Sequence, residues 1–146
     1  MALVDRALTL NASFARGWFV SGLLSLLAGQ LDRAIEHAEN SRRFSPRARV
    51  GWPFNVIGAA HLLSRRFDEA LPNLLFAIQE DPTFPEPYRH LAACYAHMGR
   101  LDEARATVAK LRAITPMVVP SDVPLRSPEH RELFLSGLRL AAGEAK

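Results

Sequence analysis

Apolar and small residues recur along the chain at the three- and four-residue intervals of amphipathic helices, in runs that short polar turns interrupt. Three of these turns contain an aspartate, in residues 29–34, 66–70 and 99–104, and each is followed by a helix-period run. Leu and Ala dominate while Thr and aromatic residues are sparse, a mixture that favours helix over strand. The sequence therefore predicts an all-α chain.

A proline follows each run, at Pro46, Pro82 and Pro116, and the spacing of the landmarks shows a repeat. The interval from Ala70 to Ala104 is 34 residues, and the interval from Pro82 to Pro116 is also 34. Between the first and second units both intervals are 36. Two independent landmarks thus agree on one period and on one two-residue insertion.

The period and the residues at fixed places within it resemble the tetratricopeptide repeat. The residues that match the family's pattern are Trp18, Gly22, Ala34 and Pro46 in the first unit; Gly58, Ala70, Leu74, Ala77 and Pro82 in the second; and Tyr88, Leu91, Ala92, Tyr95, Ala104 and Pro116 in the third. Ser21, Ser25 and Phe54 depart from it. The resemblance covers residues 15–116 and implies a right-handed superhelical solenoid of helix-turn-helix units at 15–48, 49–82 and 83–116.

Turn residues within the units support this register. Gly29 and Gly99 are expected to take the left-handed conformation that ends the first helix of a pair. Thr83 and Glu86 have the spacing of a capping box at the start of the third unit. Pro72 lies about one turn inside its helix, where proline removes a backbone hydrogen bond.

The ends of the chain carry two further expectations. Counting 34 residues back from Pro46 places residues 1–14 where the second helix of a preceding repeat would lie, so the chain is expected to begin within a repeat. Residues 117–146 read as a Pro-rich linker and a capping helix, with Ser127 as N-cap and Pro128 at the first helical position. The inward stripe of this helix is expected to be Leu133, Gly137, Leu138 and Ala141.

The resemblance also implies a binding groove, because the first helices of the units line the concave face in this family. The implied groove residues are Arg16, Phe19, Leu23, Leu26 and Leu27 in the first unit; Trp52, Asn55, Ala59, Leu62 and Leu63 in the second; and Glu86, Arg89, Ala93, Ala96 and His97 in the third. This groove would run from apolar to polar and basic. It would suit an amphipathic helix whose acidic end reaches Arg89.

Two other interpretations of the groove stay open. Phe19, Leu23 and Leu27 would be core residues if a preceding helix covered them, and the same apolar strip would let two copies of the chain pair. The family's two-carboxylate clamp, which needs Lys and Asn at set places, is absent because Phe19, Leu23 and Ala59 stand there.

Composition and charge narrow the classes of function. Catalytic motifs, phosphate-binding loops and paired metal-ligand spacings are all missing, so we expect neither an enzyme nor a bound metal or cofactor. Cys94 is the single cysteine, and mid-helix among alanines it reads as a small buried hydrophobe. The most apolar stretch, residues 18–31, is too interrupted to span a membrane, and we expect a cytoplasmic protein.

A basic cluster offers a rival function. Arg42, Arg43, Arg47 and Arg49 would bind nucleic acid if they formed one patch, but no aromatic residues interleave with them and the formal net charge is only +3. A solvated edge is the simpler interpretation.

The sequence thus predicts a non-catalytic scaffold that binds a protein or peptide. Self-association into a homodimer and RNA binding through the arginines are the alternatives. A looser resemblance to the C-terminal repeat regions of bacterial class III adenylyl cyclases rests on Phe44-Ser45-Pro46, residues 67–70 and residues 128–139. It implies a regulatory module or fragment of a larger bacterial protein.

Overall fold

The computed structural model describes residues 15–44 and 51–144, and all regular structure within these ranges is helical. The helices are α2 (Ala15–Leu27), α3 (Leu31–Phe44), α4 (Trp52–Leu63), α5 (Phe67–Glu80), α6 (Pro85–His97), α7 (Leu101–Arg112) and α8 (Pro128–Ala141). The helix expected over residues 1–14, as well as Pro46, Arg47 and Arg49, lies outside the described residues.

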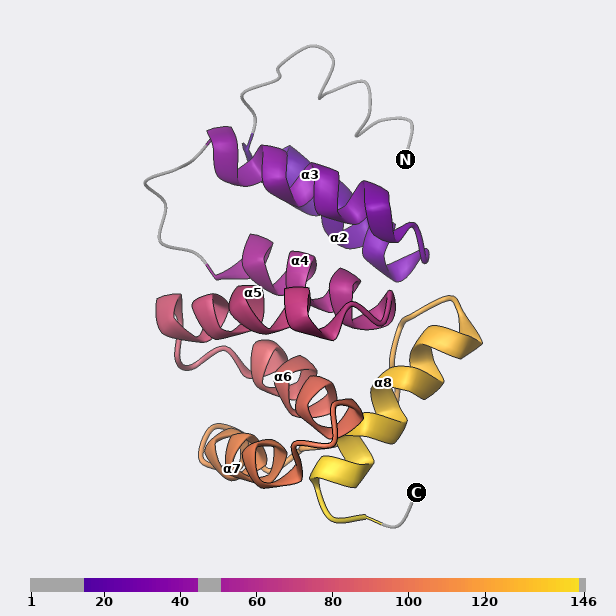
Figure 1. Cartoon of the computed structure of the whole chain (residues 1–146). Coiled ribbons are helices and arrows are strands. Elements are labelled where there is room, and N and C mark those ends of the chain that lie inside the picture. Colours follow the sequence, from indigo (N-terminus) through magenta and orange to yellow (C-terminus); the bar gives the residue numbers. More distant parts are fainter. Residues whose placement is uncertain (1–14, 45–50, 145–146) are drawn as a thin grey trace.

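The first six of these helices form three stacked pairs, α2 with α3, α4 with α5 and α6 with α7 (Figure 1). Between pairs, α3 packs against α4 and α5 packs against α6, so each pair contacts its neighbour in the stack. This arrangement confirms the predicted all-α solenoid. Each pair lies inside one of the expected units, 15–48, 49–82 and 83–116.

Close packing within a pair depends on small residues, and at Gly58 there is no room for any side chain. A Cβ atom on Gly58 of α4 would lie 2.6 Å from both Cγ and Cδ2 of Leu74 on α5, and 3.3 Å from the Leu74 backbone nitrogen. Leu74 is completely buried and so has little room to move. The absence of a side chain at Gly58 therefore sets the distance between α4 and α5.

The turn inside each pair uses a left-handed residue. Gly29 and Gly99 have φ angles of +84° and +77°, as the sequence predicted. The second pair has Arg65 at this place, with φ of +62°, although a side chain makes this conformation costly. The second turn is thus built like the others but with a strained residue.

The capping box predicted from Thr83 and Glu86 is wrong. The helix begins at Pro85 with Phe84 as its N-cap, and the Thr83 backbone and hydroxyl both donate to Asp81 Oδ1, at 3.2 and 2.8 Å. The reason lies in Pro85, because the residue before a proline avoids the helical region. Phe84 is accordingly extended, with ψ of 114°, and α6 starts one residue later than a capping box would require.

α5 continues through Pro72, which is exposed. Proline at this position cannot donate to the carbonyl one turn earlier and crowds the turn before it. The neighbouring Asn73 side chain donates from Nδ2 to the Glu69 carbonyl at 3.0 Å. This side-chain bond adds a hydrogen bond to the turn that proline disturbs.

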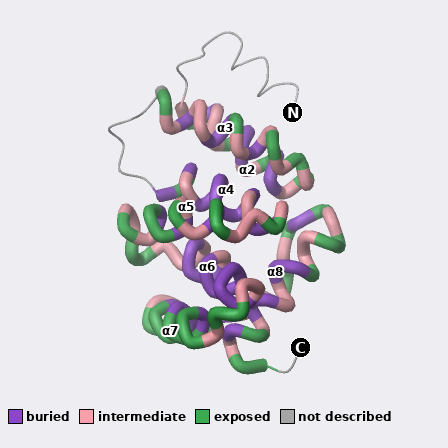
Figure 2. The backbone as a smooth tube through the Cα atoms, viewed as in Figure 1, coloured by how far each residue is buried: buried purple, intermediate pink, exposed green. Residues whose placement is uncertain are grey.

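The buried residues concentrate on α4 and α6, at the centre of the stack, while α5 and α7 are exposed along their outer sides (Figure 2). α4 and α6 carry Gly, Ala and Cys at many positions, so they pack closely against helices on more than one side. The core therefore runs through the first helices of the pairs.

The C-terminal helix follows its prediction locally. Ser127 is the N-cap of α8 and its hydroxyl accepts from the backbone N–H of His130. The predicted stripe of Leu133, Gly137, Leu138 and Ala141 is buried, together with Phe134, which the prediction omitted. α8 packs mainly against α6 and makes only smaller contacts with α4 and α7. It therefore lies across the face formed by the first helices of the pairs.

Candidate binding site

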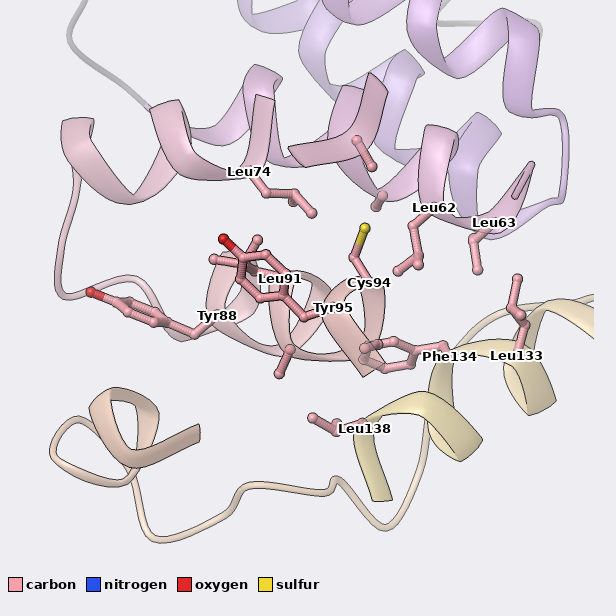
Figure 3. Close-up of a cluster of buried hydrophobic side chains, with 14 of the residues drawn as sticks. Leu62, Leu63, Leu74, Tyr88, Leu91, Cys94, Tyr95, Leu133, Phe134 and Leu138 are labelled. Atoms are coloured by element: carbon pink, nitrogen blue, oxygen red, sulfur yellow. The ribbon is translucent and has the colours of Figure 1, made fainter. Parts of the chain in front are cut away.

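We call the surface formed by α2, α4 and α6 the A-helix face, and residues 117–141 the C-terminal arm. Figure 3 shows Leu133, Phe134 and Leu138 of α8 directed toward α6 and the core that it shares with α4. The arm thus covers the third unit's part of the A-helix face. What remains of that face is the candidate site.

Arg89 of α6 holds the start of the arm. Its guanidinium donates from Nε to the Val118 carbonyl at 3.1 Å and from Nη2 to the Met117 carbonyl at 2.5 Å, while Nη1 pairs with the Glu86 carboxylate. Arg89 is only 7% exposed. Its donors are thus used inside the molecule.

His97 holds α8 itself. Its Nε2 donates to the Leu133 carbonyl at 2.6 Å, and its ring stacks on Phe67 with centroids 5.7 Å apart. Gly137 lies against this contact, where a Cβ atom would be 2.6 Å from His97 Nε2 and 2.9 Å from the Ala93 carbonyl oxygen. Glycine at 137 therefore lets α8 approach α6 closely.

The middle of the arm reaches the first unit. The backbone N–H of Arg126 donates to the carbonyl of Leu27, the last residue of α2, at 2.8 Å. Helix C-termini leave such carbonyls without an intrahelical partner. Leu125 is buried beside this contact, so the arm spans from the third unit back to the first.

Between the arm and the uncovered A-helix face lies a cavity of about 390 Å³. Its wall is almost wholly apolar and combines residues from α2, α4, the start of α6 and the arm. The lining residues are Phe19, Leu23, Leu26, Leu27, Trp52, Asn55, Val56, Ala59, Leu63, Phe84, Glu86, His90, Val123, Pro124, Leu125 and Phe134.

Only three polar side chains interrupt this wall. His90 Nδ1 donates to Asn55 Oδ1 at 2.9 Å, which fixes both groups, and the His90 ring packs on Phe134 with centroids 5.0 Å apart. Burial lowers the pKa of His90, because the charged ring would lose its hydration in these surroundings. Glu86 is the one formally charged residue of the lining.

Three comparisons place this architecture among known proteins. Residues 61–118 match the family model of the tetratricopeptide repeat. Residues 61–118 are therefore a tetratricopeptide-repeat segment. Among solved structures, YrrB, described as a repeat protein of this family with an unusual peptide-binding site, is 25% identical over 97% of this chain and 74% of its own, with a TM-score of 0.65.

Other solved structures share the fold of this chain at lower identity. TTC0263, a thermophilic protein of this family from Thermus thermophilus, is 22% identical over 97% of this chain and 72% of its own, with a TM-score of 0.70. MamA is 17% identical over 96% of this chain and 83% of its own, with a TM-score of 0.70. No curated protein matches the chain.

Within this repeat array, most of the groove residues expected from sequence in the first two units line one cavity. They are Phe19, Leu23, Leu26, Leu27, Trp52, Asn55, Ala59 and Leu63, and Glu86 of the third unit joins them. Leu62 is completely buried, and Arg16 is exposed outside the lining.

The structure corrects the basic end that the sequence predicted for the groove. Arg89 and His97 were expected to face a partner, but both bond to backbone carbonyls of the arm. Ala93 and Ala96 are buried, and Ala93 lies under Gly137 of α8. The arm occupies the place that the sequence assigned to an acidic ligand end. The arm's own lining residues, Val123 to Leu125 and Phe134, had no local signal that could place them there.

The remaining candidates have structural surroundings of their own. Arg42 pairs with Glu39 at 2.9 Å and lies over the Phe54 ring at 4.1 Å, so one of the four clustered arginines has intramolecular partners. Burial raises the pKa of the Cys94 thiol to about 12, which keeps it protonated and poorly nucleophilic at neutral pH.

Over the described ranges, His, Cys, Asp and Glu form no group that could hold a metal ion. Within the same ranges, each helix is too short or too polar to cross a bilayer.

Proposed function

We propose that the chain is a non-catalytic scaffold that binds another protein or a peptide through the cavity between the A-helix face and the arm. The observation that carries the proposal is the cavity itself, about 390 Å³ with an almost wholly apolar wall. Ligand pockets typically combine such walls with a few placed polar groups. Asn55, Glu86 and His90 fit that description.

The shape of the site supports a short anchor. A helix lying along the whole A-helix face would collide with α8, which is buried against α6 through Leu133, Phe134 and Leu138. One or two bulky apolar side chains of a partner segment fit the remaining cavity better. The peptide-binding site described for YrrB supports peptide binding as the class of function. The resemblance to the repeat regions of adenylyl cyclases stays a prediction.

The partner's side chains would enter next to Leu23, so Leu23→Asp tests the proposal. Peptides selected from a displayed random library against the wild-type chain serve as probes, and their affinity is measured by fluorescence anisotropy. A carboxylate inside an apolar cavity is costly, and we expect at least about a 100-fold loss of affinity. Leu24→Asp is the matched control, since Leu24 lies on the same helix, is 41% exposed and is outside the lining.

A second measurement does not depend on how Leu23→Asp folds. The chain has two tryptophans, and Trp18→Phe leaves Trp52 of the cavity wall as the only indole reporter. Binding in the cavity should shift Trp52 emission. Selected peptides that bind Trp18→Phe as tightly as wild type but cause no shift of Trp52 emission would place the binding site elsewhere.

Sedimentation of the same two variants tests self-association, the alternative function. Val20 and Leu24 are exposed apolar residues on an outer side of α2, not in the cavity lining. A wild-type dimer that Leu24→Asp dissociates and Leu23→Asp preserves would assign that outer side to a homodimer contact instead.

A further inference from the structure

Three aromatic rings form a row along the cavity, one from each repeat unit. Phe19 and Trp52 have centroids 5.4 Å apart, and Trp52 and Phe84 have centroids 5.5 Å apart. Trp52 is 48% exposed, so the row lies where the cavity meets solvent. We call these three residues the aromatic row. An exposed tryptophan beside an apolar cavity is the type of residue that dominates binding energy at interfaces.

Glu86 lies two residues after Phe84 and gives this edge its charge. Its side chain is 42% exposed, and its Oε1 accepts from Arg89, whose other donors bond to the arm. Glu86 belongs to the first turn of α6, where free N–H groups would ordinarily favour anions. Pro85 and Pro87 remove two of these donors, which weakens any attraction for an anion.

The molecule repeats one chemical arrangement elsewhere, an arginine that lies over an aromatic ring and pairs with a glutamate. Arg100 lies 4.8 Å from the Tyr95 ring centroid and bonds twice to Glu103 at 2.6 Å. Arg42 lies over Phe54 and pairs with Glu39 in the same way. The quadrupole of the ring attracts the cation, and the carboxylate adds a separate ion pair.

The aromatic row and Glu86 line the same cavity, but Arg89, the cation that pairs with Glu86, does not lie over the row. Across residues 15–44 and 51–144, no arginine or lysine lies over Phe19, Trp52 or Phe84. The arginine that pairs with Glu86 is directed to Met117 and Val118 of the arm instead. On the arm, Asp122 and Arg126 flank the lining residues Val123–Leu125 in the sequence and are opposite in sign.

We propose that the partner supplies a cation for the aromatic row, as an arginine or lysine next to its apolar anchor. This inference rests on the proposed function, because the anchor fills the cavity while the cation lies over the aromatic row and pairs with Glu86. The partner segment is therefore basic, which reverses the acidic end that the sequence suggested. A glutamate at the same place would face Glu86 across an apolar surface.

Three capped synthetic peptides test the charge directly. One carries two leucines followed by an arginine, and the others replace that arginine with citrulline, its neutral isostere, or with glutamate. Affinities are measured through Trp52 fluorescence in Trp18→Phe. We expect the arginine peptide to bind about tenfold more tightly than the citrulline peptide, with weakening by added salt, and the glutamate peptide to bind least.

Two variants should remove this preference. In Glu86→Gln and Trp52→Leu the affinities of the arginine and citrulline peptides should differ by less than about threefold, even where the variant weakens binding of both peptides. Binding to Trp52→Leu is followed by anisotropy of labelled peptides. Phe76→Leu is the matched control, because it removes a ring that is 40% exposed on α5, outside the cavity, and should leave the preference intact.

Equal affinity of the arginine and citrulline peptides for the wild type would overturn the inference, while cavity-dependent binding of both would leave the proposed function standing. A preference for the glutamate peptide would overturn it as well. Absence of binding by all three peptides, at concentrations where library-selected peptides bind, would overturn the inference alone. If selected peptides also failed, the proposed function would fall first.

Discussion

The guanidinium of Arg89 bonds to the main chain at Val118, with Nε and the carbonyl oxygen 3.1 Å apart. These residues lie 29 positions apart in the sequence, and their contact fixes where the arm leaves α7. The sequence analysis assigned Arg89 to ligand recognition. In the structure Arg89 is instead buried and positions the arm, which forms one wall of the cavity.

Reversing this charge should unfold the arm. Arg89→Glu would place a carboxylate beside the Met117 and Val118 carbonyls and Glu86, and a buried unpaired charge typically costs about 3–5 kcal/mol. Urea unfolding followed by circular dichroism measures the loss. Arg105→Glu is the control, because the Arg105 side chain is 63% exposed, and its cost should stay below about 1 kcal/mol. Equal stability of the two variants would mean that Arg89 does not hold the arm.

Filling the space at Gly58 should separate α4 from α5. We expect Gly58→Ala to cost about 1–3 kcal/mol in unfolding free energy, because its Cβ meets Leu74 and the core is already full. Leu74→Ala alone creates a cavity and also destabilises. The double variant should be less destabilised than the sum of the two, by at least about 0.5 kcal/mol. Strict additivity would show that the two residues do not share one space.

The strained turn at Arg65 offers a stabilising change. Arg65→Gly should raise the unfolding free energy by about 0.5–1 kcal/mol, since glycine accepts φ of +62° without the side-chain penalty. At this chain length that corresponds to a melting temperature about 1–4 °C higher. Ser64→Gly, next to it at φ of −85°, gains no such relief and should destabilise. A lower melting temperature for Arg65→Gly would contradict the strain.

Stability should fall as the pH drops from 7 to 5. Burial, the largest cause, lowers the pKa of both His90 and His61 below the ordinary value of 6.5, with Arg66 adding to the effect at His61 and Arg89 at His90. Below pH 6.5 the unfolded chain therefore binds more protons than the folded one, and folding loses free energy until the pH reaches the depressed pKa.

Each such histidine contributes a slope of at most about 1.4 kcal/mol per pH unit in that window. His90→Gln should reduce the slope, with the remainder at His61, where Arg66 Nε donates to Nδ1 at 3.1 Å. The Glu86 carboxylate opposes the shift at His90, while the neighbours from α4 and α8, Asn55 and Phe134, are uncharged. An unchanged slope in His90→Gln would show that His90 titrates normally in the folded chain.

Most of the fold follows from signals within short stretches of the sequence. Ser127 followed by Pro128 marks a helix start through one side-chain bond and one fixed dihedral, and the stripe from Leu133 to Ala141 follows from helical periodicity alone. The capping box predicted from Thr83 and Glu86 is wrong because Pro85 keeps Phe84, the residue directly before it, out of the helical conformation. This constraint between adjacent residues outweighs the side-chain hydrogen bonds that the box would make.

Only one wall of the cavity, the one formed by α2 and α4, could be predicted from the sequence. Residues of α2 and α4, such as Leu23 and Ala59, follow from the repeat register, since every unit presents the same helix positions. The opposite wall depends on where the arm runs, which contacts like Arg89 with Val118 decide. Such contacts leave no periodic trace, so Pro124 and Phe134 gave no indication of a shared cavity.

The bond from the Arg126 backbone to Leu27 has a mechanical consequence. A solenoid whose units touch only their neighbours can flex like a spring and open from either end independently. Here one segment braces the first unit against the third, so the curvature of the stack cannot change without straining or releasing that brace. Fraying of α2 therefore has to break a contact with the arm, which would not be needed in a stack whose units touch only their neighbours.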